Sequence, residues 1–166
     1  TTGPGVIDWL GRPLRGNGDA DSSLLQVIYA GADGVADPPS PDGAATGDDV
    51  LLQGAGSAAT FGRFGEGDGI PLDAGRFLKP FLHGLTTGEV VYVRAWDGSS
   101  FDGSVAYGDS ALYSVSGAAG ETNDFGAWTV GMPIDFVRDL NGDSVADGWN
   151  VVHGGDPVLP TGPLNP

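Results

Sequence analysis

The sequence predicts an all-β protein built as an antiparallel β-sandwich, and three observations carry that prediction. Short apolar runs alternate with turn clusters, and none of them continues as a convincing helix of three turns. Glycine and proline, 30 and 12 residues, punctuate these runs without forming a period. Nearly all of the 22 acidic residues are Asp, which favours turns, whereas Glu, which favours helices, is rare.

Residues 90–96 are the clearest expected strand, because Val91 and Val93 fall on one face and Tyr92 and Arg94 on the other. Large side chains on both faces predict that this strand is central. Strands of this kind, joined by Gly-rich turns, predict an immunoglobulin-like or jelly-roll-like sandwich, with a closed barrel as the alternative. The expected strands are residues 6–10, 24–30, 50–53, 58–61, 76–82, 89–96, 111–116 and 125–130.

Two long Asp/Gly-rich loops and a Pro-rich tail complete the expected organisation. The loops cover residues 31–49 and 97–110, and loops of that length in a compact domain are usually functional or mobile. We expect a β-sandwich domain over residues 1–136, a calcium-binding segment over 137–157 and an extended tail over 158–166.

The formal net charge of −15 excludes some partners and favours others. Nucleic acid is not an expected partner, because it requires a basic footprint. Bound cations would relieve the repulsion among so many carboxylates. No apolar run reaches the roughly 18 residues that span a membrane. There is no Cys, so calcium is the expected staple in place of disulfides.

Residues 139–150 place oxygen-bearing side chains at alternate positions of a twelve-residue loop, which is the ligand spacing of a Ca²⁺ site. The backbone carbonyl of Val145 would occupy position seven of this loop, and Asp156 would complete the site. The remaining expected ligands are the side chains of Asp139, Asn141, Asp143, Asp147 and Asn150.

Two departures weaken this expected site. Ser144 stands where Gly normally makes the sharp turn, and Asn150 offers one neutral oxygen where a bidentate Glu usually closes the loop. The loop therefore predicts an affinity in the extracellular range, about 10⁻⁴–10⁻³ M. The alternative is an Asx-rich turn that holds no metal.

The run DLNGDSVADGWN, with the exit at Asp156 and Pro157, resembles the thrombospondin type 3-like calcium repeat of bacterial secreted proteins. The part of the chain before it is similar to a β-rich domain found beside such repeats in secreted and surface proteins. This resemblance implies an extracellular setting and brings no enzymatic residues. The segments that carry it are LLQVIYAG (24–31), GDDVLL (47–52), VYVRAW (91–96), YGDS (107–110) and DFGAW (124–128).

The long loop at residues 31–49 is the candidate for a second calcium site, with a solvated acidic loop as the alternative. Weaker candidates of the same kind lie at residues 17–21 and 97–109. The candidate ligands in the long loop are Asp33, Asp37, Asp42, Asp48 and Asp49.

Catalysis is not expected. Glu66 and Asp68 lie two residues apart in a Gly-rich turn, which is a poor arrangement for a glycosidase pair. His83 and His153 lack the context of a zinc site. No nucleophile elbow or phosphate-binding glycine loop is present.

The expected function is that of a secreted calcium-binding structural protein, a self-assembling subunit of an extracellular filament or surface matrix. An arm at residues 6–10 would add a strand to the open sheet edge of another copy. The start without Met suggests a removed signal peptide, although a trimmed chain would look the same. The alternative is a carbohydrate-binding or adhesin module that contacts extracellular polysaccharide through Trp9, Trp96, Trp128 and Trp149.

Overall fold

The computed structural model describes residues 5–16, 20–40, 42–52, 62–65, 72–78, 84–118 and 123–133. These residues form an antiparallel sheet and contain no helix, so the predicted mostly-β fold is confirmed. Consequently, none of them belongs to a helix long and apolar enough to cross a membrane. The strands within them are β1 (Ile7–Asp8), β2 (Leu24–Tyr29), β3 (Val50–Leu52), β4 (Gly62–Arg63), β5 (Val90–Trp96), β6 (Ala106–Asp109), β7 (Tyr113–Ser114), β8 (Thr129–Val130) and β9 (Met132–Pro133).

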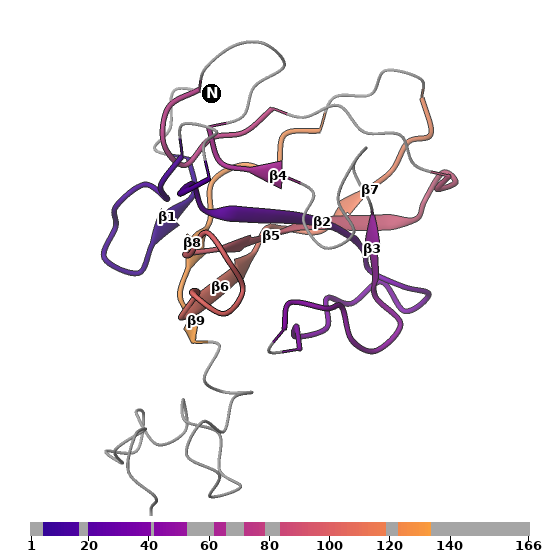
Figure 1. Cartoon of the computed structure of the whole chain (residues 1–166). Helices are drawn as coiled ribbons and strands as arrows, with labels where there is room; N and C mark the ends of the chain where they lie inside the picture. Colours follow the sequence, from indigo (N-terminus) through magenta and orange to yellow (C-terminus); the bar gives the residue numbers. More distant parts are fainter. Residues whose placement is uncertain are drawn as a thin grey trace, which may run out of the picture.

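The antiparallel pair β2 and β5 forms the centre of the sheet (Figure 1). Its register runs from Leu25 opposite Ala95 to Tyr29 opposite Val91. Nearly every residue of the two strands is buried, as expected for a strand covered on both faces. The predicted central position of residues 90–96 is therefore confirmed, and it follows from their large side chains on both faces.

Short strands line each side of the central pair. β3 and β4 follow one another along β2, and β6 and β7 follow one another along β5. β9 then extends the sheet beyond β6. None of these flanking strands is longer than four residues, and short edge strands offer little template for pairing with another chain.

β1 and β8 form a separate, parallel pair. Ile7 lies opposite Thr129, and Asp8 opposite Val130. The expected arm at residues 6–10 is thus already paired within its own chain, and its strand ends at Asp8, where a turn begins. The expectation of a free strand at residues 6–10 is corrected on this point.

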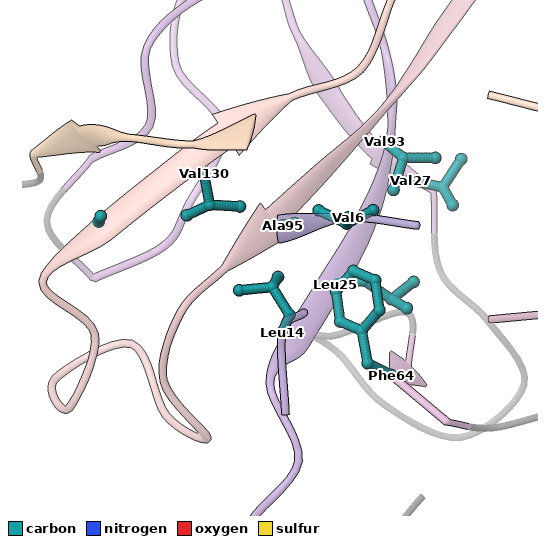
Figure 2. Close-up of a cluster of buried hydrophobic side chains, with 9 residues drawn as sticks. Val6, Leu14, Leu25, Val27, Phe64, Val93, Ala95 and Val130 are labelled. Carbon is teal, nitrogen blue, oxygen red and sulfur yellow. The ribbon is translucent and has the colours of Figure 1, made fainter. Parts of the chain in front are cut away.

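The main hydrophobic core covers one face of the sheet (Figure 2). Phe77 packs against this core with its ring 5.6 Å from the ring of Phe64, edge to face. β1's neighbour Val6 and the β8 residue Val130 therefore reach the same core as the central strands. The core consists of Val6, Leu14, Leu25, Val27, Phe64, Val93, Ala95, Ala106 and Val130.

Strand β6 lies inside the segment expected to be a long loop, residues 97–110. Gly108 and Asp109 both have low strand propensity, which conceals β6 in the sequence. Their roles come from tertiary contacts: a Cβ at Gly108 would lie 2.5 Å from the carbonyl oxygen of Thr129, and Asp109 pairs with Arg94. In the expected strand at 76–82, the described residues 76–78 are not in a strand, and residues 58–61 lie outside the described part.

We expect Leu25→Ala to lower the free energy of unfolding by about 2–5 kcal/mol, because it leaves a cavity under the central strand pair. Leu112→Ala is the matched control, since Leu112 is half exposed and its truncation should cost no more than about 0.5 kcal/mol. Urea unfolding of the two variants measures the difference. Equal stabilities would contradict this description of the core.

Candidate functional site

The second face of the sheet carries the polar side chains of Gln26 and Arg94 between two smaller apolar clusters. It is covered by the acidic loop, defined as residues 31–40 and 42–49. The side chain of Gln26 donates a hydrogen bond to the carbonyl oxygen of Gly43 at 2.8 Å and accepts one from the indole N–H of Trp96 at 2.8 Å. Gly43 has a φ of +83°, and a Cβ there would lie 2.4 Å from the ring of Phe101. Glycine at this position therefore lets the loop backbone descend onto the sheet.

Arg94 on β5 is the charged centre of this face. Its guanidinium pairs with both carboxylate oxygens of Asp109 at 2.7 and 2.8 Å, and Nη2 also donates to the carbonyl oxygen of Asp37 at 2.5 Å. The rings of Tyr92 and Tyr107 lie within 5.4 and 5.1 Å of the guanidinium carbon. Burial alone would lower the pKa of Arg94, but the bonds and charge of Asp109 outweigh it and raise that pKa.

Asp49 closes the loop onto the same face. Its Oδ2 accepts the Tyr92 hydroxyl at 2.6 Å and the Asp37 N–H at 2.9 Å, whereas its buried Oδ1 has no hydrogen-bond partner. Burial raises the pKa of Asp49, against the lowering effect of these two bonds. Burial also raises the pKa of Tyr92, which keeps its phenol protonated. The hydrogen bonds of Asp49 therefore hold the acidic loop against this face of the sheet.

The other acids of the loop accept hydrogen bonds from nearby amides. Asp48 Oδ2 accepts the N–H groups of Ala32 and Asp33 at 2.6 and 3.3 Å. Asp33 Oδ1 accepts a hydrogen bond from Val35 N at 2.9 Å, and Asp42 Oδ1 accepts one from Ala44 N. These are the local turns that Asp commonly forms.

The described acids do not converge on one point. No three of the His, Asp or Glu side chains in the described ranges form a group that would hold a metal ion. The guanidinium of Arg94 also lies close to Asp37 and Asp49, and its positive charge opposes the binding of a metal cation beside it. A second calcium site formed by the five candidate ligands of this loop stays a prediction.

Two acids of the weaker candidate at residues 97–109 already have hydrogen-bond partners within the protein. Asp97 accepts hydrogen bonds from the N–H groups of Val105 and Ala106 at 2.9 and 3.1 Å, and Asp109 pairs with Arg94.

The principal calcium loop, residues 139–150, and its completing residue Asp156 lie outside the described residues. Calcium binding there remains a prediction from the spacing of its oxygen-bearing residues.

The expected strand at residues 6–10 does not include a hydrogen-bonded turn at residues 8–12, which we call the tip. Asp8 Oδ1 accepts the N–H groups of Leu10 and Arg12 at 2.9 Å each, and Oδ2 pairs with the Arg12 guanidinium at 2.7 Å. The turn presents Trp9 and Leu10 to solvent with 64% and 53% of their surfaces exposed. Asp followed three residues later by Gly11 was the available signal, because both favour turns.

The base of the tip is anchored in the core. Val6 and Leu14 flank it and are buried, and they are joined by a hydrogen bond from Leu14 N to Val6 O at 3.0 Å. Val6 N donates to Gly75 O at 2.8 Å, and Ile7 N donates to Trp128 O at 3.1 Å. The backbone on both sides of the exposed apolar pair is therefore bonded to the rest of the domain.

The tryptophans of the described residues do not form a flat binding platform. Trp96 is fully buried, and its ring packs against those of Phe101 and Tyr107. Trp128 packs against the core, and its indole N–H donates to the carbonyl oxygen of Gly108 at 3.1 Å. Trp9 is the exposed member of these three, and Trp149 lies outside the described part.

No family model, curated protein or solved structure matches this chain. Its function is therefore inferred from its own residues and their geometry.

We expect Arg94→Met to lower the free energy of unfolding by about 3–5 kcal/mol, because it leaves the Asp109 carboxylate without its partner on a largely buried face. Arg12→Met is the matched control: its ion pair with Asp8 is on the surface, and its loss should cost at most about 1 kcal/mol. Urea unfolding of both variants compares them. A smaller loss for Arg94→Met than for Arg12→Met would show that the buried pair does not hold the loop.

Asp49→Asn should make the protein more stable at neutral pH. Since the folded-state pKa of Asp49 is raised, its favourable contribution is present below the ordinary value of 3.8 and is lost as pH rises through the folded-state value. Asn keeps an acceptor for Tyr92 and removes the charge, so the gain over the parent should disappear toward about pH 3.

Urea unfolding between about pH 3 and pH 8 tests this. Asp73→Asn removes an equal charge from an exposed position and should change the free energy of unfolding by no more than about 0.5 kcal/mol. A neutral-pH stability for Asp49→Asn below that of the parent would contradict the expected sign.

Proposed function

We propose that this chain is a secreted, non-catalytic structural protein that binds calcium and assembles with copies of itself into an extracellular filament or surface matrix. The observation that carries the proposal is the tip, which holds Trp9 and Leu10 exposed on a turn fixed by Asp8 and Arg12. A pre-ordered apolar projection loses little conformational freedom when it is buried against a partner. Such a feature suits a contact surface and costs solubility if nothing covers it.

The second face of the sheet supports a structural role. The groups that resemble reactive ones, Tyr92 on β5 and Asp49 at the end of the acidic loop, are buried and hydrogen-bonded to each other. Their arrangement fixes a loop and offers no opening to a substrate. A protein that works outside the cell without disulfides benefits from such fastenings.

Calcium enters the proposal through charge and spacing. A net charge of −15 makes close approach of two copies unfavourable unless cations screen or bridge the carboxylates. The loop at residues 139–150, whose first oxygen-bearing residues are Asp139, Asn141 and Asp143, is the best-defined candidate binding site for such a cation in the sequence. We therefore propose that calcium controls assembly and takes no part in catalysis.

The finer architecture that we propose is a sandwich whose second layer begins with the β1–β8 pair. Val6 and Val130, which flank or belong to this pair, pack on Leu25 and Val93 of the main sheet. Two layers sharing one core is the arrangement of a sandwich.

Binding to polysaccharide is the second candidate, and the described tryptophans give it less support than assembly. A sugar platform usually needs aromatic rings exposed side by side, whereas Trp96 is buried and Trp128 is packed against the core. Trp9 alone presents a large exposed aromatic surface among the described tryptophans.

The full chain should form filaments or larger assemblies in calcium at about 1 mM and dissociate in excess EDTA. Sedimentation velocity and electron microscopy measure this. The double variant Asp139→Asn, Asp143→Asn should raise the calcium concentration for half-assembly by at least about tenfold, because it removes two charged ligands.

The matched control removes the same number of charges outside every candidate calcium site, as Glu66→Gln with Asp73→Asn, and should assemble like the parent. A parent chain that stays monomeric in calcium argues against the proposed assembly. Assemblies that persist unchanged in EDTA argue against control by calcium.

A further inference from the structure

A small cleft lies beside the base of the tip, between residues 72–78 and 123–126. Its volume is about 220 Å³, and its walls include the apolar side chains of Val6, Leu72, Phe77, Leu78 and Phe125. The ring of Phe77 contacts those of Phe64 and Trp128 at centroid distances of 5.6 and 6.4 Å, so this wall is fixed by the core.

The size of the cleft fits one large side chain better than a free small molecule. Small-molecule sites usually begin at roughly 300 Å³, which is larger than this cleft. A cavity of roughly 150 Å³ holds benzene, so a somewhat larger one accommodates a two-ring aromatic group such as an indole. The apolar walls match that type of occupant.

Polar groups at the cleft match the remaining chemistry of the tip. Asn123 lines the cleft, and its Oδ1 is buried without a hydrogen-bond partner. A buried indole N–H requires an acceptor, which an amide oxygen supplies. At the rim, the exposed carboxylate of Asp124 has the charge opposite to that of Arg12, which accompanies Trp9 in the tip.

We propose that the tip of one copy inserts Trp9 and Leu10 into this cleft of a second copy, an inference that rests on the proposed self-assembly. The tip cannot enter its own cleft, because the cleft is lined by Gly5 and Val6 at the base of that same tip. The tip and the cleft are different surfaces of one chain, so the contact is heterologous. Repetition of a heterologous contact that does not close into a ring produces a filament.

Two variants separate the two halves of the contact. Trp9→Ser removes the inserted aromatic side chain, here called the knob, and keeps the cleft. Leu78→Asp places a charge at the cleft rim and keeps the knob. Both positions are about half exposed or more, so the fold should survive, which circular dichroism and thermal unfolding verify. Val105→Ser, at an equally exposed apolar position outside the cleft, is the matched control.

In calcium, each of the two variants alone should self-associate at least about 30-fold more weakly than the parent, the change expected for a hot-spot residue. An equimolar mixture of Trp9→Ser and Leu78→Asp should form one-to-one dimers and nothing longer, because only one intact knob and one intact cleft remain. Sedimentation equilibrium measures both results. The control should assemble like the parent.

The outcomes distinguish this contact from the proposed function. If the parent assembles and Trp9→Ser assembles equally well, the contact is wrong while the assembly stands. If the variants stay monomeric but their mixture forms no dimer, the knob-and-cleft pairing is likewise overturned. If the parent itself never assembles, the proposed function falls and the contact falls with it.

Discussion

The burial of one guanidinium group constrains much of this structure. Arg94 sits on a central strand with essentially no exposure, and a buried charge is tolerated only when it is fully paired. Asp109 supplies the opposite charge, the Asp37 carbonyl supplies another acceptor, and two tyrosine rings flank the group. The strand β6 and the acidic loop must therefore both close on Arg94 before the sheet is complete.

The sequence predicts the centre of this fold well and its periphery poorly. Residues 90–96 and 24–30 carry large side chains at successive positions, so both faces of each strand are apolar or large. This pattern matches the burial of both faces of β5 and β2. β6 has no such pattern, because Gly108 is required by the close approach of Thr129 and Asp109 by the charge of Arg94. Both requirements arise from residues distant in the chain, so local propensity cannot reveal them.

The functional features divide in the same way. An Asp in a Gly-rich loop has the same local sequence whether it binds calcium or accepts backbone amides, and in the acidic loop the amides are the partners. Periodicity predicts a strand that ends in Trp9 and Leu10, whereas the tip is fixed by hydrogen bonds to Asp8, which periodicity does not reveal. The cleft joins segments about 50 residues apart and has no signature in the sequence.

The parallel pairing of Ile7 with Thr129 affects when, during synthesis and folding, the orientation of the tip becomes fixed. Ile7 is synthesised near the start of this segment, yet its partner strand is made more than a hundred residues later. Pairings between such distant residues form late in folding. Trp9 and Leu10 are thus displayed in a fixed orientation only after the chain has reached β8. Under the proposed self-assembly, this order of formation limits association between chains in which β8 has not yet been made.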